Sequence, residues 1–373
     1  MKELSSLDLK FLAHEFQVLI NAKVEQIYQS REEFIIQFHI PNKGKTYLRL
    51  IAGTLVYMAR AKGVMPERPP SFCLYMRRQL KNARLRIVEQ LGFERVLHLV
   101  FETKDKRFNL YFEILSKGNI VLCNEENIVL SATSYQEWKD RSIKRGKSYT
   151  PPSRDVDITT DYVASLAQTL KGSDKESVVK SLAIDFGLGG KYSEELCTRA
   201  GIDKSIKPGS LSEKEVLDLV GHVKGFINSD PSPRVILKHD SPVDIVPVPL
   251  SVYKDELSKD FDSFNNALDS VYTAQIHEAQ ITQTKKVSDS RLSRVQVIIN
   301  EQEQRIRGLE KAEKENQKKG EVIYENYPKV KEILDEINNQ KKEHSLKEIA
   351  VILKKNKVIK SLDEATGDVV IEL

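Results

Sequence analysis

The stretch from Ser258 to Lys319 contains no proline, and it restricts the fold of this chain more than any other feature. Its apolar residues recur at spacings of three, four and seven, as on one face of a long α-helix that packs in a coiled coil. The residues of this apolar seam are Leu292, Val295, Ile299, Ile306 and Leu309, with Gln302 in the remaining seam position. Since a single helix cannot keep such a stripe from water, we expect the seam to pack on another helix, such as that of a second copy in a homodimer.

Residues 1–154 predict an α+β domain whose sheet is mostly antiparallel. Residues 4–20 have the apolar spacing of an amphipathic helix, with Ser5 or Ser6 as its N-cap. Apolar and polar residues then alternate in VEQIYQ, EFIIQFHI and TYLRLIAG, which is typical of antiparallel strands. A second helix is expected in SFCLYMRRQLKNA, after which strands resume with RLRIVEQ.

Residues 155–230 predict a helical domain in which short polar turns separate the helices. A glycine-rich turn between two of these helices indicates a helix-hairpin-helix unit. The candidate RNA-binding residues of this turn are Gly187, Gly189, Gly190 and Lys191. Backbone N–H groups in such turns bind phosphates in some proteins, whereas in others the glycines only let two helices pack closely. Both interpretations stay open.

The rest of the chain divides into three segments. Residues 231–257 are rich in proline, and we expect them to return to the first sheet as a strand or two. Residues 258–319 form the long coiled-coil helix. Residues 320–373 predict a small middle module, with a helix after Pro328 and a hairpin around Gly367. Because the chain then ends on a strand without a returning helix, we expect a truncated arm or a seam that another chain covers.

The overall charge does not by itself indicate a nucleic-acid-binding protein. Lysine and arginine number 58 and aspartate and glutamate 54, a formal net charge of +4, so any basic surface must be local. Arg77 and Arg78 lie on a predicted helix, and Arg141 and Arg145 follow Trp138. Guanidinium groups suit phosphate and aromatic rings stack on bases, so these four arginines are RNA-binding candidates. The alternative is an ordinary solvated surface.

No sequence signature of catalysis or metal binding stands out. The histidines are scattered, and the common nucleophile, zinc and phosphate-loop motifs do not occur. The three cysteines are far apart, which fits a reducing cytosol better than a metal site. No stretch resembles a signal peptide or approaches the roughly 18 apolar residues of a membrane span. We therefore expect a cytoplasmic protein with no catalytic residue, cofactor, metal or membrane contact.

Three charged residues occupy unusual positions. Asp8 lies inside an otherwise apolar helix, where a carboxylate needs a hydrogen-bond donor. Glu94 and Arg95 are neighbours at the start of a predicted strand, so they face opposite ways and each should meet its own partner. A helix cap and structural ion pairs are the simplest explanation of all three.

The order of several segments resembles that of the NFACT family, which includes NEMF and RqcH. The segments that carry the resemblance are LSSLDLKFLAHEF, VEQIYQ, PPSFCLYMRRQL, GFERVLHLVF, YFEILSKGNIVL, GKSYTPP, GLGGKYSEELCTRAGID and KKGEVIYENYPKVKEIL. The resemblance implies an N-terminal domain similar in fold to the formamidopyrimidine DNA glycosylases, and a two-helix coiled-coil arm that carries a small middle module. The family normally continues through a returning helix into a C-terminal domain.

The resemblance also implies a role in ribosome-associated quality control. Family members bind a large ribosomal subunit that still holds peptidyl-tRNA, through its rRNA, and recruit aminoacyl-tRNA so that untemplated residues are added to the stalled chain. The peptidyl-transferase centre of the ribosome performs that chemistry, so an RNA-binding factor rather than an enzyme is expected. Asp8 and Arg95 match family residues implicated in tRNA handling, and Glu94 stands where the family has aspartate.

Two other function classes remain open at this point. One is a glycosylase-like DNA repair enzyme, against which the opening Met1-Lys2 argues, because the glycosylases act through an N-terminal proline amine. The other is a fibronectin-binding adhesin, against which the lack of a signal peptide argues.

Overall fold

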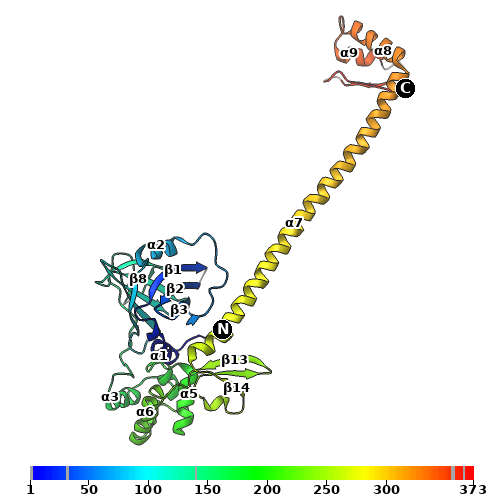
Figure 1. Cartoon of the computed structure of the whole chain (residues 1–373). Coiled ribbons are helices and arrows are strands. Elements are labelled where there is room, and N and C mark those ends of the chain that lie inside the picture. The colour runs from blue at the N-terminus through cyan, green and yellow to red at the C-terminus, as the bar shows by residue number, and fades with distance from the viewer. Residues whose placement is uncertain (1–2, 31–32, 139–140, 354–357, 364–365) are drawn as a thin grey trace. The chain divides into compact units, whose positions relative to one another are not determined.

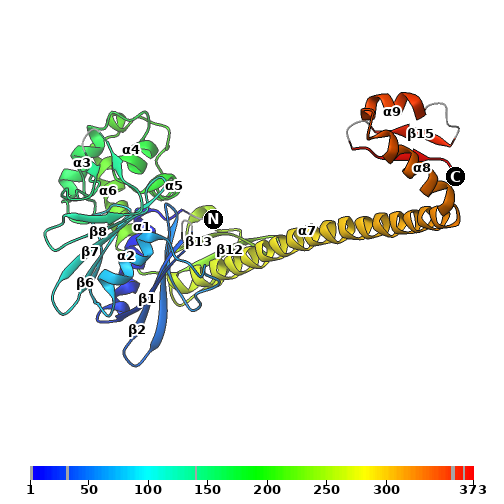
Figure 2. The ribbon, with the colours of Figure 1, turned by 90° about the horizontal axis from the view of Figure 1, so that it is seen from above.

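The computed structural model describes residues 3–30, 33–138, 141–353, 358–363 and 366–373, and leaves the side chains of 276–288 undescribed. The chain divides into two compact units, Met1–Thr282 and Gln283–Leu373. Within the first unit, strands β1 to β9 and helices α1 and α2 form one group, and helices α3 to α6 form another beside which strands β13 and β14 lie (Figures 1 and 2). The predicted α+β architecture is confirmed.

A nine-stranded antiparallel sheet organises the N-terminal domain, in the order β4-β3-β2-β1-β5-β6-β7-β8-β9. Its strands are β1 (Lys23–Ser30), β2 (Glu33–Ile40), β3 (Gly44–Ile51), β4 (Leu55–Ala59), β5 (Arg84–Gln90), β6 (Val96–Glu102), β7 (Arg107–Glu113), β8 (Asn119–Cys123) and β9 (Val129–Ala132). Strands β1 and β5 pair only at Lys23 and Arg84, so the sheet consists of two halves joined at one corner. A small hairpin, β10 (Gln136–Glu137) and β11 (Ser142–Ile143), follows β9.

Helices α1 (Ser6–Glu15) and α2 (Ser71–Leu80) pack on this sheet, with the 3-10 turn η1 (Phe16–Leu19) after α1. Of the two predicted caps, Ser5 is the one used. Its hydroxyl accepts a hydrogen bond from the Asp8 N–H, and the Asp8 carboxylate accepts one from the Ser5 N–H, a capping box. The apolar positions of α1, including Leu7, Phe11 and Leu12, are buried in the main core.

The helical domain contains α3 (Val163–Lys171), α4 (Val178–Ile184), α5 (Gly189–Ala200), η2 (Pro208–Ser210) and α6 (Glu213–Ile227). Helices α4 and α5 flank the glycine-rich turn, as the predicted helix-hairpin-helix unit requires. Ser212 caps α6 through a second capping box. Gly201 ends α5 in the left-handed conformation, φ 64°, that glycine adopts without strain.

The proline-rich segment forms a separate three-stranded sheet, so the prediction that it rejoins the first sheet is wrong. Its strands are β12 (Arg234–Lys238), β13 (Ser241–Val246) and β14 (Leu257–Asp260), with the 3-10 turn η3 (Ser251–Tyr253) between the last two. Strand β12 is central and pairs with both others. The backbone of residues 257–260 is therefore engaged in a strand, and Ser258 does not start the long helix.

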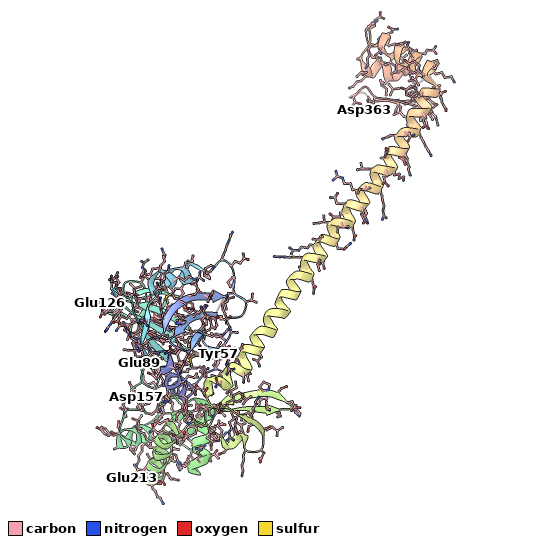
Figure 3. The ribbon with its side chains drawn as sticks, in the orientation of Figure 1. Tyr57, Glu89, Glu126, Asp157, Glu213 and Asp363 are labelled. Carbon is pink, nitrogen blue, oxygen red and sulfur yellow. The ribbon has the colours of Figure 1, made fainter. Side chains whose placement is uncertain are left out.

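The long helix α7 runs from Phe264 to Glu325. Its first turn is capped from α1, because the Glu15 carboxylate accepts hydrogen bonds from the N–H groups of Phe264 (2.8 Å) and Asn265 (2.8 Å). The Asn265 amide bonds both the N–H (2.6 Å) and the carbonyl (2.9 Å) of Met58 on β4. Tyr57, labelled in Figure 3, lies 3.3 Å from the Thr273 hydroxyl. We call this set of contacts the α7 root.

The predicted boundary at Lys319 is also wrong, because α7 continues through Gly320 and ends just before Pro328. That proline lies in the first turn of α8 (Tyr327–Gln340), where its missing N–H costs nothing. The seam residues of α7 are 43% (Ile299) to 65% (Leu292) exposed. Among the described residues, no helix is both long and apolar enough to cross a membrane.

The middle module has a small core of its own. Helix α8 packs with α9 (Leu346–Leu353), which the sequence did not reveal, and with an antiparallel hairpin of β15 (Ile359–Leu362) and β16 (Val369–Ile371). The predicted hairpin is confirmed. The buried residues of this core are Ile333, Ile337, Ile349, Leu353 and Ile359.

Candidate functional site

The N-termini of α1 and α5 meet at a cavity of about 320 Å³, which we call the α1–α5 cavity. Six of the residues singled out in the sequence line it, namely Asp8, Arg95, Gly187, Gly189, Gly190 and Lys191. They come from three distant parts of the chain, so the fold brings together what the sequence only suggested separately. Glu94 contacts the cavity indirectly, through Arg154 in its wall.

Asp8 holds α1 against α5. Its carboxylate accepts hydrogen bonds from the N–H and hydroxyl of Ser5, both at 2.9 Å, and from the Tyr192 hydroxyl at 2.6 Å. Burial, and then the Asp8 charge, raise the pKa of Tyr192 well above its usual value, so the tyrosine stays protonated and donates. The helix-cap explanation of Asp8 is therefore confirmed, and this carboxylate also links the two domains.

Glu94 and Arg95 lie in the turn before β6 rather than in the strand, which begins at Val96. The expectation that each meets a different partner holds for Glu94, whose carboxylate lies 2.7 Å from Nη1 of Arg154. Burial raises the pKa of Glu94, and the charge of Arg154 opposes that effect. Glu94 is thus a positioning residue for Arg154.

Arg154 was not predicted from the sequence, although it organises the glycine-rich turn. Its guanidinium donates to the carbonyls of Phe93 and Ile184, both at 3.2 Å. A Cβ on Gly187 would lie 2.5 Å from Arg154 Nη1, and Gly187 has a φ of +70°. Only glycine therefore fits at this position, because any side chain would displace Arg154 and strain the backbone.

Arg95 differs from the other charged residues of the cavity. It is half-buried and, within the described part of the chain, its guanidinium has no hydrogen bond or ion pair. Burial lowers the pKa of Arg95, and the nearby Glu3 charge opposes this. A partly desolvated guanidinium that lines a cavity without a partner is well placed to bind an anion from outside.

Lys191 and the two remaining glycines play separate parts. The Lys191 ammonium is paired with the buried Asp244 carboxylate and lies 5.9 Å from the Tyr253 ring centre, so its charge is already compensated. Gly189 has a φ of +74°, which explains its identity, whereas a Cβ on Gly190 would meet only open space. Gly190 therefore leaves the start of α5 accessible beside the cavity.

The predicted arginines on α2 lie at a different place. Arg77 Nε donates to the Ile27 carbonyl at 2.7 Å, and Arg78 is exposed with its guanidinium 5.9 Å from the Tyr75 ring centre. Together with Lys81 they line a cavity of about 280 Å³ against β1. Arg78 is thus free to meet a ligand, while Arg77 supports the edge of the sheet.

The last two predicted arginines also differ from each other. Arg141 is paired with the buried Glu113 carboxylate, and its Nε donates to the Thr150 carbonyl at 2.7 Å. Arg145 is exposed in the turn after β11. The structure therefore argues against Arg141 as a free phosphate ligand, and Arg145 keeps that role as a prediction.

Comparisons with known proteins agree with this architecture. The sequence model of the NFACT N-terminal and middle domains matches residues 5–366. The archaeal Rqc2 homolog aRqcH of Methanocaldococcus jannaschii is 28% identical over 392 residues, which cover 100% of this chain and 58% of that protein. Human ribosome quality control complex subunit NEMF is 24% identical over 355 residues, which cover 86% of this chain and 32% of NEMF. The chain thus spans little more than half of the archaeal relative and about a third of the human one.

Solved structures share the fold at low sequence identity. The N-terminal part of the fibronectin/fibrinogen-binding protein from Streptococcus suis superposes with a TM-score of 0.59 at 20% identity, covering 73% of this chain and 100% of that one. The fibrinogen-binding protein from Staphylococcus aureus gives a TM-score of 0.59 at 18% identity, covering 71% of this chain and 97% of that one. Because the family model extends over nearly the whole chain, this protein belongs to the NFACT family.

Proposed function

We propose that this protein is a ribosome-associated quality-control factor of the cytoplasm, which binds an obstructed large ribosomal subunit and tRNA. In this role it supports untemplated C-terminal extension of stalled nascent chains. The support is its membership of the NFACT family and its similarity to the archaeal Rqc2 homolog aRqcH and to the human ribosome quality control complex subunit NEMF. The factor positions RNA, and the peptidyl-transferase centre of the ribosome forms the peptide bonds.

The observation that carries the proposal is the unpaired guanidinium of Arg95 in the α1–α5 cavity. Two acidic groups of this region are already engaged, Asp8 by Ser5 and Tyr192, and Glu94 by Arg154, whereas the exposed Glu3 is the acidic residue whose charge acts most on Arg95. The cavity also receives the N-terminus of α5, whose backbone dipole favours an anion. A tRNA phosphate is the anion that best fits the proposed function, with Arg95 as its principal ligand.

The exposed seam of α7 requires a partner, and we propose a helix of a second copy in an antiparallel homodimer. Its five apolar residues would each contribute roughly 1.5–3 kcal/mol if fully buried. Gln302 interrupts the stripe and would favour one register over others, as polar seam residues do in coiled coils.

The test of the main proposal is sedimentation with purified large subunits that carry peptidyl-tRNA, followed by crosslinking and sequencing of the bound RNA. Wild-type protein should sediment with the subunit and crosslink to tRNA. Arg95→Ala should lose most of the tRNA crosslink while its thermal melting stays unchanged. Lys214→Ala, which removes an exposed charge from α6, is the matched control and should behave as wild type. Equal tRNA crosslinking by both variants would refute the assignment of Arg95.

A further inference from the structure

Trp138 is the single tryptophan of the chain, and it is 46% exposed. It follows β10 in the small hairpin beyond the edge strand β9. Trp138 does not line the α1–α5 cavity. A half-exposed tryptophan ring offers a large apolar surface to a ligand, and tryptophan is enriched at binding interfaces for this reason.

The indole is held in place from within the protein. The Arg141 guanidinium lies 4.8 Å from the centre of the Trp138 ring and 5.6 Å from that of Tyr149. Arg141 is itself fixed by the Glu113 carboxylate, which also accepts a hydrogen bond from the Tyr149 hydroxyl at 2.8 Å. Burial is the largest cause that raises the pKa of Tyr149, so its hydroxyl remains a donor. The Arg141 guanidinium, held by Glu113, thus contacts the Trp138 ring and supports it.

Trp138 and Arg141 line a cavity of about 600 Å³, which we call the Trp138 cavity. This volume lies in the range of roughly 300–1,000 Å³ that is common for ligand sites. The turn of residues 115–118 also lines this cavity, and the backbone of another turn contacts it. A Cβ on Gly118 would lie 1.9 Å from the backbone nitrogen of Gly53, so the two turns touch backbone to backbone.

The charges around the Trp138 cavity are uneven. Both acidic side chains in its wall are compensated, Glu113 by Arg141 and Glu137 by Lys144 at 2.6 Å. Lys117 is exposed on the turn of residues 115–118 and, within the described residues, has no hydrogen bond or ion pair. Among the residues that the structure describes, the site therefore presents one aromatic face and one cation without a compensating charge.

We infer that the Trp138 cavity binds an unpaired RNA base, which stacks on Trp138 while Lys117 meets the adjoining phosphate. Stacking on an aromatic ring together with a cation for the backbone is how proteins hold single-stranded nucleic acid. An acidic peptide would satisfy Lys117 but would leave the indole face uncovered. The inference rests on the proposed function, since it supposes that the protein binds RNA, and it adds a contact separate from the α1–α5 cavity.

The single tryptophan makes a direct test available, because emission excited at the long-wavelength edge, where the 13 tyrosines do not absorb, reports on Trp138 alone. Titration with a short oligoadenylate RNA should quench this emission saturably. Inorganic polyphosphate, which has charges but no bases, should bind without quenching. RNA that binds with unchanged emission, or polyphosphate or an unstructured acidic peptide that quenches as strongly, would overturn the inference.

Affinity of a labelled oligoadenylate, measured by fluorescence anisotropy, gives a second readout. Trp138→Ala should weaken binding roughly 5- to 150-fold, as expected for the loss of one base stack worth about 1–3 kcal/mol. Trp138→Phe keeps a ring and should lose less, and Lys117→Gln should lower the salt slope by roughly one while the quenching persists. Equal affinity of Trp138→Ala and wild type would refute the stacking site. If the crosslink between tRNA and the protein still depended on Arg95 in that case, the proposed function would stand. If the wild-type protein bound neither the large subunit nor RNA, both the proposed function and the stacking site would be refuted.

Discussion

Replacing Asp8 by alanine removes the acceptor of three hydrogen bonds at the contact between α1 and α5. Loss of the capping interaction with Ser5 costs about 0.5–2 kcal/mol. The buried Tyr192 hydroxyl also loses its partner, which costs about 1–3 kcal/mol. Asp8→Ala should therefore lower the free energy of unfolding by roughly 1.5–5 kcal/mol, or the melting temperature by roughly 3–20 °C for a unit of this size.

Two further variants separate the contributions, with thermal melting and urea unfolding as the assays. Asp8→Asn keeps the shape and one accepting oxygen, which can serve Ser5 while its amide N–H donates to the Tyr192 hydroxyl, and it should lose only about 1 kcal/mol, the difference between a charged and a neutral hydrogen bond. Tyr192→Phe removes the hydroxyl alone and should cost about 1.5–3 kcal/mol. The losses of Asp8→Ala and Tyr192→Phe should not add, because both break the same bond. If Asp8→Ala melted as wild type yet lost the tRNA crosslink, Asp8 would be an RNA ligand and this reasoning would be refuted.

Three other predictions follow from the described contacts. Arg78→Gln with Arg145→Gln should lower the slope of log RNA affinity against log salt by roughly two, because each exposed arginine releases counterions from one phosphate. Asn265→Ala should destabilise the first unit by about 1–3 kcal/mol in urea unfolding, since it leaves a strand N–H and carbonyl of β4 without their partner. Wild-type protein should self-associate in analytical ultracentrifugation, and Ile299→Asp with Ile306→Asp should make it monomeric.

The first two of these predictions have a control variant, and the third has an outcome that would contradict it. Arg141→Gln should destabilise the fold without the same change in salt slope, because that arginine is paired internally with Glu113. Asn266→Ala changes the residue next to Asn265. The Asn266 side chain makes no hydrogen bond in the described structure, so this variant should leave the free energy of unfolding unchanged. A wild-type protein that stays monomeric at high micromolar concentration would contradict the homodimer proposal.

Local signals in the sequence were sufficient for much of the first domain. The Ser5 cap, the alternation in β1 to β3 and the glycine turn before α5 all depend on residues close together in the chain. Strand β14 was missed because its four residues are all exposed and show no alternation. Residues 257–260 form a strand because they pair with β12. The start of α7 likewise depends on a distant residue, Glu15, which is 249 residues away from Phe264.

The candidate site was predictable only in part, for a similar reason. Asp8, Arg95 and the glycines stood out by type and position, and the fold brings them together. Arg154 gave no signal, because its partners Phe93 and Ile184 lie 61 and 30 residues away. Arg141 resembled a free cation beside aromatic residues, since its partner Glu113 is 28 residues earlier on another strand. Sequence reasoning therefore selects candidate charges but does not tell which of them are already paired.

Helix α1 contacts the α1–α5 cavity at one end and the first turn of α7 at the other. Helix α1 has 10 residues and is therefore about 15 Å long. Ser5 and Asp8 lie at its N-terminal end, beside the cavity, and Glu15 at its C-terminal end caps the first turn of α7. Because α1 is mostly buried and contacts both places, we expect that a ligand in the cavity reduces fraying of the α7 root. Amide hydrogen exchange at Phe264 and Asn265 should slow when tRNA binds. Unchanged protection would show that α1 supports the fold without coupling the cavity to the start of α7.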